Sequence, residues 1–326
     1  MLNHFDPPAL LRNPHVQSVL AGLKLRRPLV AQRAKNMLAH SRPVILDCPD
    51  GVRLKGWYSK RQATKGRLAI LIHGWEGSAD SLYLMSAAGY LYELGFDVFR
   101  LNLRDHGDTH HLNRGLFHSC RIDEVVAAVK QIQEIYPHDR MFLGGFSLGG
   151  NFCIRVAVRA PQSGIRLHRV VAVSPVIDPA KATVAIESGW SLYHRYFMKK
   201  WRRSLARKRL LFPDMAALGA LGRYGTLTAM TDFLTARFTD FPDLAAYFRG
   251  YTITRELLKQ LAVPVHIIAS QDDPVIPAED LNTLGRTEFL TIESLNYGGH
   301  CGFLKNWRFQ SWADERIAEL FLQDLQ

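Results

Sequence analysis

A repeated alternation constrains the fold of this chain most strongly: short apolar runs rich in β-branched residues are followed by longer segments with helical periodicity. Such alternation predicts βαβ units and a mostly parallel sheet. The expected strands are residues 43–48, 52–58, 67–72, 97–103, 140–144, 169–174, 264–269 and 288–292. The expected helices are residues 79–94, 121–136, 148–160, 278–285 and 311–325. Pro49-Asp50-Gly51 is a turn signal, so the first two strands should form an antiparallel hairpin at the sheet edge.

The alternation stops between residues 178 and 257, where the sequence is helix-like, aromatic and basic. No linker separates this region from its neighbours, so we expect a helical cap inserted after the sixth strand. Residues 1–177 and 258–326 should then form one α/β core. A chain of 326 residues with 47% hydrophobic residues can bury a core of that size.

The net charge of +11 is concentrated in one segment, because residues 195–209 carry eight basic residues and no acidic one. In a helix, Phe197, Trp201 and Leu205 of this segment would share one side. Two interpretations stay open: peripheral contact with an anionic membrane, or a solvated lid helix whose cationic side chains cover the core. No nucleic-acid-binding motif accompanies the charge, so we expect no nucleic acid as a partner.

The sequence contains no apolar run near the roughly 20 residues that span a bilayer, and no secretory signal is evident at its start. The expectation is a cytoplasmic protein, with at most peripheral membrane association. Its four cysteines are far apart and include no C-x-x-C pair, so we expect no disulfide. They are Cys48, Cys120, Cys153 and Cys301.

The main chemical signal is Gly145-Phe146-Ser147-Leu148-Gly149, between an expected strand and an expected helix. A G-x-S-x-G pattern in that position predicts a nucleophile elbow, a sharp turn that presents the serine hydroxyl above the sheet. The glycines should be needed because such a turn leaves no room for Cβ atoms. Serine at this position excludes a reaction that uses an aspartate nucleophile.

A serine hydroxyl needs a base, and the base needs an orienting carboxylate. In α/β hydrolases the acid and then the histidine follow the serine along the chain, on loops after late strands. Asp273 and His300 occupy such loops here, and Asp273 is preferred over Asp272 because Pro-Val-Ile-Pro follows it. The Gly-Gly before His300 would let its loop fold back over the strand ends.

Two backbone N–H groups should stabilise the oxyanion that forms when the serine attacks a carbonyl. We expect these donors to be Leu148, just after the serine, and Trp75, in the His73-Gly74-Trp75-Glu76-Gly77 loop after the third strand. His73 is expected to be structural, bonding the backbone of that loop.

Taken together, these motifs resemble those of α/β-hydrolase fold proteins. The more specific resemblance is to YheT-type hydrolases, which are related to mammalian ABHD1/ABHD3 proteins and yeast medium-chain acyltransferase/esterases. It extends over nearly the whole chain, through segments that include NPHVQ at residues 13–17, GFSLGGN and GGHCGF. The resemblance implies a carboxylesterase or lipase-like enzyme that hydrolyses acyl esters or transfers the acyl group to an alcohol. It implies no cofactor.

Residues 104–111, RDHGDTHH, raise the alternative of a metal-dependent hydrolase. Their spacing lacks the pattern of binuclear sites, so we expect loop-bonding roles and no metal. Under the metal hypothesis, Asp105, His106 and Asp108 would be the residues to watch. A second alternative is a non-catalytic protein of the same fold that binds lipid or a partner through the basic cap.

Overall fold

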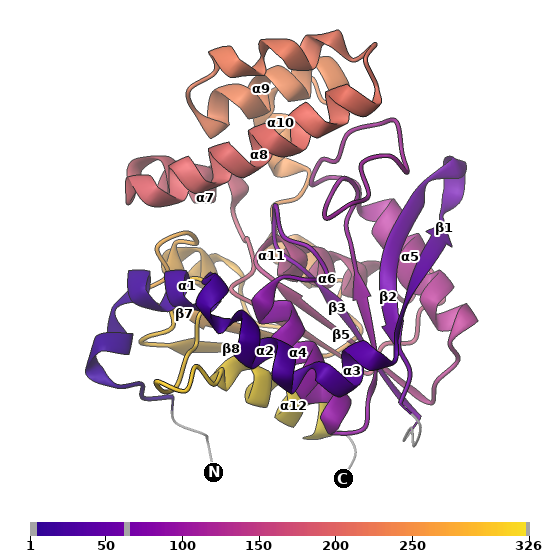
Figure 1. Ribbon diagram of the computed structural model, residues 1–326, viewed down its shortest axis with the longest axis vertical. Coiled ribbons are helices and arrows are strands. Elements are labelled where there is room, and N and C mark those ends of the chain that lie inside the picture. The colour runs from indigo at the N-terminus through magenta and orange to yellow at the C-terminus, as the bar shows by residue number, and fades with distance from the viewer. Residues whose placement is uncertain (1–4, 62–65, 324–326) are drawn as a thin grey trace.

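A computed structural model describes residues 5–61 and 66–323 (Figure 1). Its centre is one eight-stranded sheet in the order β1-β2-β4-β3-β5-β6-β7-β8. The strands are β1 (Ser41–Asp47), β2 (Arg53–Ser59), β3 (Arg67–Ile72), β4 (Asp97–Leu101), β5 (Arg140–Phe146), β6 (Arg169–Val173), β7 (Val265–Ser270) and β8 (Leu290–Leu295). β2 pairs antiparallel with both β1 and β4, and the other neighbours are parallel. The predicted edge hairpin and mostly parallel sheet are confirmed.

Helices cover both faces of the sheet (Figure 1). On one face, α4 (Leu82–Glu93) packs against α2 (Arg27–Arg33), α3 (Lys35–Ala39) and α12 (Trp312–Gln323). On the other face, α5 (Ile122–Ile135) packs against α6 (Leu148–Arg159). Most predicted helices are therefore present, although residues 278–285 form only the short 3-10 helix η5 (Ala278–Thr283). Residues 324 and 325 of the last predicted helix lie outside the described residues.

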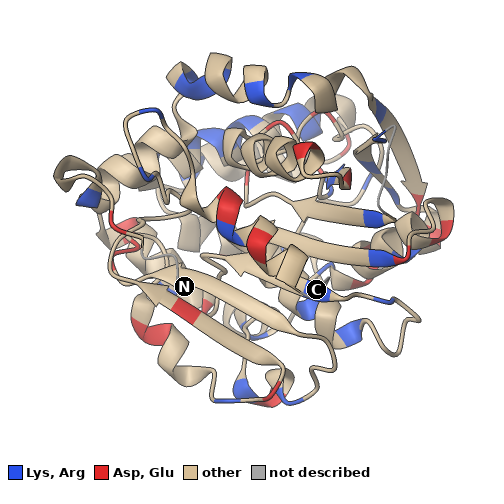
Figure 2. Cartoon of the chain, turned by 90° about the horizontal axis from the view of Figure 1, so that it is seen from below, with Lys and Arg blue, Asp and Glu red and all other residues tan. Residues whose placement is uncertain are grey.

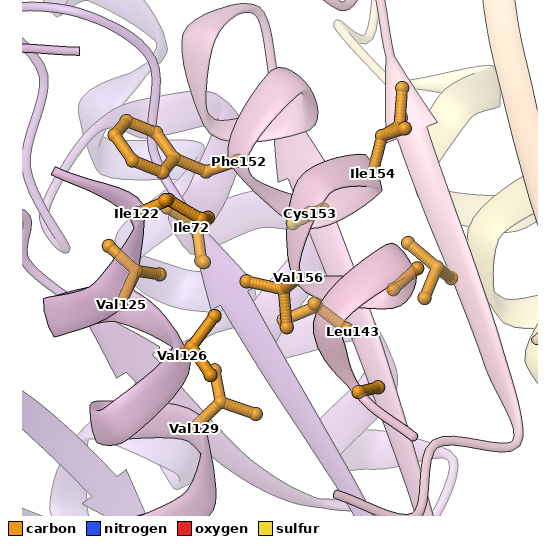
Figure 3. Close-up of a cluster of buried hydrophobic side chains, with 14 of the residues drawn as sticks. Ile72, Ile122, Val125, Val126, Val129, Leu143, Phe152, Cys153, Ile154 and Val156 are labelled. Atoms are coloured by element: carbon orange, nitrogen blue, oxygen red, sulfur yellow. The ribbon is translucent and has the colours of Figure 1, made fainter. Parts of the chain in front are cut away.

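The amphipathic pattern of α5 places its apolar stripe in the core. Its buried side chains Ile122, Val125, Val126 and Val129 pack with residues of α6 such as Phe152 (Figure 3). Burial of each such side chain contributes about 1.5–3 kcal/mol relative to exposure. This packing fixes α6, which begins directly after the candidate nucleophile Ser147.

Short helices that the sequence patterns did not predict precede the sheet. They are η1 (Ala9–Arg12), α1 (Pro14–Gly22) and η2 (Lys24–Arg26), followed by α2 and α3. α1 begins at Pro14, whose missing N–H is not needed at a helix start. The side chain of Asn13 caps the helix by accepting hydrogen bonds from the N–H groups of His15 and Val16.

Helices occupy the chain between β6 and β7, and all but the last of them lie beyond one end of the sheet, at the top of Figure 1. They are α7 (Pro179–Ser188), α8 (Ser191–Leu211), η4 (Ala216–Arg223), α9 (Leu227–Phe238), α10 (Leu244–Arg249) and α11 (Arg255–Leu258). Buried residues of α7, α8, η4 and α9 form an apolar cluster with Leu116, Val275 and Ile276. The division into a core and a cap at residues 178 and 257 stays a prediction.

The basic segment, residues 195–209, makes up most of α8, but not all of its cations are at the surface. Lys208 is buried, and its Nζ lies 2.7 Å from Oδ1 of Asp105. The interpretation of the whole segment as a solvated or membrane-facing surface is therefore wrong at Lys208. Its ammonium group contacts oxygen atoms of the loop after β4 and not water or lipid. The face opposite the cap carries both acidic and basic residues (Figure 2).

Candidate active site

Ser147 lies at the sharp turn between β5 and α6, with φ 54° and ψ −121°. A positive φ is costly for a residue with a Cβ, and such strain is retained where the surroundings fix it. Here the Ser147 N–H donates to the carbonyl oxygen of Val173 at 2.8 Å, and its carbonyl oxygen accepts from the Asn151 N–H at 3.1 Å. The turn thereby holds the hydroxyl group clear of the sheet.

The two glycines of the motif are required by close packing, as predicted. A Cβ on Gly145 would lie 2.4 Å from the carbonyl oxygen of Gly149. A Cβ on Gly149 would lie 2.4 Å from the carbonyl oxygens of both His73 and Ile72. Both distances are far inside van der Waals contact, so neither position accepts a larger residue without movement of the backbone.

His300 links the serine to a carboxylate. Its Nε2 lies 2.9 Å from Oγ of Ser147, and its Nδ1 lies 2.9 Å from Oδ2 of Asp273. An ionised carboxylate only accepts hydrogen bonds, so Nδ1 carries the proton and Nε2 of the neutral ring accepts from the serine hydroxyl. The structure thus brings together three side chains that are far apart in the sequence.

The two neighbouring aspartates have different positions. Asp273 reaches His300, and its Oδ1 also accepts hydrogen bonds from the N–H groups of Val275 and Ile276 at 2.8 and 3.0 Å. Asp272 instead accepts from the N–H of Gly299 at 2.9 Å, which anchors the loop that carries His300. Of the two candidates, only Asp273 contacts the imidazole.

The N-terminal helix α1 also holds the His300 loop, a contact that the sequence patterns did not indicate. The N–H of His300 donates to Oγ of Ser18 at 2.8 Å. The buried amide of Gln17 accepts from the N–H of Leu304 at 2.7 Å and donates to its carbonyl oxygen at 3.0 Å. The NPHVQ segment, singled out by resemblance alone, therefore has a structural role beside the site.

Two backbone segments approach Ser147, the first turn of α6 and the loop after β3. Leu148 is the first residue of α6, so its N–H has no partner within the helix. The loop with Trp75 approaches from β3, and a Cβ on Gly74 would lie only 3.1 Å from Cβ of Ser147. The Gly74 N–H donates to the Tyr83 hydroxyl at 2.9 Å, which fixes this loop.

His73 stabilises the same loop as a neutral ring, and its predicted structural role is confirmed. Its Nε2 accepts from the N–H of Leu103 at 3.2 Å, and its Nδ1 donates to the carbonyl oxygen of Gly74 at 2.7 Å. Burial holds the pKa of His73 well below its ordinary value. The ring therefore stays uncharged beside the candidate site.

The pKa of His300 is shifted in the opposite direction. Burial lowers this pKa, but the negative charge of Asp273, the neighbouring Cys301 and the hydrogen bond to the Asp273 carboxylate together outweigh burial. The net result is a pKa well above the ordinary value of 6.5. The pair thus favours an imidazolium, the ion that His300 would become on accepting a proton.

An apolar pocket opens beside Ser147, with an empty volume of about 770 Å³ including its mouth. Its wall combines core residues with cap residues such as Ile186, Phe197 and Leu227. A few polar groups lie among them, including Tyr247, whose hydroxyl accepts from the N–H of Ser119 at 3.1 Å.

The apolar stripe of α8 faces this pocket. The ring of Phe197 stacks on Trp75 at a centroid distance of 5.2 Å, and Trp201 meets Trp75 edge-on at 5.1 Å. Leu205 is buried in the cap cluster. Because these side chains are used inside the protein, the lid interpretation fits the stripe better than insertion into a membrane. Peripheral contact through the exposed cations stays a prediction.

The residues of the RDHGDTHH segment bind protein groups. Asp105 pairs with Lys208, and Asp108 pairs with Lys55 at 2.9 Å. His106 and His110 contact the carbonyl oxygen of Arg104 and the hydroxyl of Ser204. The predicted loop-bonding role is confirmed. Within residues 5–61 and 66–323, no cluster of three or more His, Cys, Asp or Glu side chains could hold a metal ion.

Across the same described residues, none of the helices combines the length and hydropathy needed to cross a bilayer.

The chain belongs to the alpha/beta hydrolase fold family, whose sequence model matches residues 70–306. Among curated proteins it is similar to the mouse phospholipase ABHD3, with 20% identity over 263 residues. That match covers 78% of this chain and 62% of the mouse protein. It also resembles the mouse monoacylglycerol lipase ABHD2, with 23% identity across 60% of this chain and 51% of that protein. The chain thus spans less than two thirds of either relative.

Solved structures of low sequence identity share the fold. The Pyrococcus furiosus esterase Pf2001 superposes with a TM-score of 0.60 and 17% identity, covering 89% of this chain and 94% of the esterase. A membrane phospholipase A described as a bacterial virulence factor superposes with a TM-score of 0.58 and 16% identity, covering 92% of each chain. The narrower assignment to YheT-type hydrolases stays a prediction.

Proposed function

We infer that the chain is a serine hydrolase that cleaves carboxylic esters through an acyl-enzyme intermediate. One observation carries this conclusion: His300 lies within hydrogen-bond distance of both Ser147 and Asp273. A serine, a histidine and a carboxylate in this order of contact form the arrangement that activates a hydroxyl group at neutral pH.

In the proposed reaction, Oγ of Ser147 attacks the acyl carbon of the ester, and Nε2 of His300 takes the hydroxyl proton. Asp273 stabilises the imidazolium that results. We assign the oxyanion donors to the N–H of Leu148, which directly follows Ser147, and the N–H of Trp75, which follows Gly74 in the loop beside Ser147. His300 then protonates the departing alcohol.

Water or a second alcohol would complete the reaction by attacking the acyl-enzyme, with His300 as the base. Water gives hydrolysis, and an alcohol gives acyl transfer. We assign the acyl group to the apolar pocket because Phe197, Ile186 and Leu227 line it beside the serine. The relatives named as a phospholipase and a monoacylglycerol lipase support an acyl ester, including a lipid-like one, as the substrate.

A fluorophosphonate probe tests the proposal, because such probes form a covalent bond with an activated serine. We expect the wild-type chain to be labelled and Ser147→Ala to remain unlabelled. Ser191→Ala is a matched control, since Ser191 is an exposed serine at the start of α8. Absence of labelling in a folded wild-type protein would favour the non-catalytic binding protein instead.

A further inference from the structure

A second cavity lies across the His73–Gly77 loop from the apolar pocket. Trp75 lines the apolar pocket, whereas the next two residues, Glu76 and Gly77, line the second cavity. Its empty volume is about 1350 Å³ including the open mouth. Tyr83, which fixes Gly74 against Ser147, lines it as well. One short loop therefore contacts the nucleophile and forms a wall of both cavities.

Cationic side chains from two distant parts of the chain line this second cavity. They are Lys200, Arg203 and Arg207 of α8, together with Lys24 and Arg27 of the N-terminal helices. Figure 1 shows α8 running above these N-terminal helices. The sequence suggests a basic patch only on α8, and the fold adds two cations to it from residues 24–27.

The acidic residues of the cavity do not neutralise these cations. Asp105 pairs with buried Lys208, which lies outside the lining. Asp80 lies 3.2 Å from Arg100, which is also outside the lining. Burial raises the pKa of Glu76 to about 7, although Lys200 opposes this shift, so its carboxyl group is only partly ionised at neutral pH.

Several of the cations have donors available. Lys200 donates to the carbonyl oxygen of Glu76 at 2.8 Å, and Arg207 donates to that of Gly107 at 3.2 Å. Among the described residues, the side chains of Lys24, Arg27 and Arg203 have no hydrogen-bond or ion-pair partner. A cavity with unpaired guanidinium groups favours a ligand with several anionic oxygens, because guanidinium binds phosphate through two parallel hydrogen bonds.

We propose that this cavity binds a phosphate group on the alcohol part of the ester substrate. The inference rests on the proposed function, since it requires Ser147 to cleave an ester. The acyl group would occupy the apolar pocket, and the phosphorylated alcohol would extend past the Gly74–Gly77 loop into the basic cavity. In the reaction, the bond between the acyl carbon and the alcohol oxygen breaks. The phosphorylated alcohol leaves with a proton from His300, and water supplies the new acyl oxygen.

The test compares two soluble esters with the same acyl group, butyrylglycerol and butyrylglycerol 3-phosphate. We expect wild-type kcat/KM to be at least about tenfold higher for the phosphorylated ester, as charge-assisted hydrogen bonds allow. Arg27→Ala combined with Arg203→Ala should remove that preference and leave the neutral ester within twofold of wild type. Arg195→Ala is the matched control, because Arg195 is exposed on α8 and outside the cavity lining.

Equal kcat/KM for the two esters in the wild type would overturn the proposal. Inhibition by inorganic phosphate without any preference between the esters would also overturn it, because the cavity would then bind a free anion. If neither ester is cleaved and the fluorophosphonate probe does not react, the proposed function itself fails. Glycerol 3-phosphate binding then tests the cavity alone: binding that the double variant loses supports the anion site, and no binding to the wild type refutes it.

Discussion

At the scale of single residues, the candidate site depends on the proton affinity of His300. A general base must be neutral to accept a proton, and Asp273 favours the protonated ring of His300. In the proposed reaction, the same interaction would stabilise the imidazolium that forms. We therefore expect Asp273 to stabilise this charged intermediate and, by keeping His300 protonated, to lower the activity at low pH.

The raised pKa of His300 sets the expected pH profile. As pH rises through that pKa, His300 loses its proton and kcat/KM increases, so the midpoint of this rise should lie above pH 6.5, the ordinary histidine value. In Asp273→Asn the raising charge is lost while burial remains, so the midpoint should move to lower pH. Activity on a nitrophenyl ester should also fall by about 10³–10⁴-fold.

Asp272→Asn serves as the control for that profile. Asp272 holds the N–H of Gly299 and does not contact the imidazole, and an amide oxygen can still accept that hydrogen bond. Its midpoint should stay near that of the wild type. If Asp273→Asn leaves the midpoint unchanged or raises it, the assignment of Asp273 as the partner of His300 is wrong.

At the scale of elements, α8 is joined to the loop after β4 by Lys208. Only 1% of the Lys208 side chain and 7% of the Asp105 side chain are exposed. Nζ of Lys208 also donates to the carbonyl oxygens of His110 and Gly115 at 3.2 and 3.4 Å. Lys208 thus anchors α8 to the loop after β4, and Phe197 and Trp201 of the same helix line the apolar pocket.

Removal of the ammonium group should leave the carboxylate of Asp105 buried without its partner. Lys208→Met is therefore expected to lower the free energy of unfolding by about 3–5 kcal/mol in urea denaturation. Asp105→Asn combined with Lys208→Met should recover part of this loss, since neither of these two positions then buries a charge. Lys199→Met, at an exposed position of the same helix, should change stability by about 0.5 kcal/mol or less. A similar loss in both single variants would contradict the account.

At the scale of the whole molecule, the sequence predicted those features of the fold that depend on short stretches of residues. The strands, the edge hairpin and the turn at Ser147 follow from periodicity and turn residues, and the candidates Asp273 and His300 follow from their places after late strands. It did not predict α1 to α3, because these helices are short and are stabilised by contacts with distant segments, such as Gln17 with Leu304.

Local sequence patterns also could not predict which charged side chains are buried. Lys208 belongs to a run of cations that is typical of an exposed face, and only the fold brings Asp105 to it. In the same way, the second cavity depends on Lys24 and Arg27 lying opposite Lys200 and Arg203. Such contacts arise from tertiary packing between segments about 100 to 180 residues apart in the sequence.

The most direct test of the central claim is the site of the covalent intermediate. The enzyme is mixed with a nitrophenyl ester, quenched with acid in the first turnovers and digested, and the acyl group is located by peptide mass spectrometry. The account predicts an acyl adduct on Ser147 that is absent in Ser147→Ala. An acyl adduct on another residue would contradict the account. Ester turnover that leaves no adduct and is as fast in Ser147→Ala as in the wild type would contradict it as well.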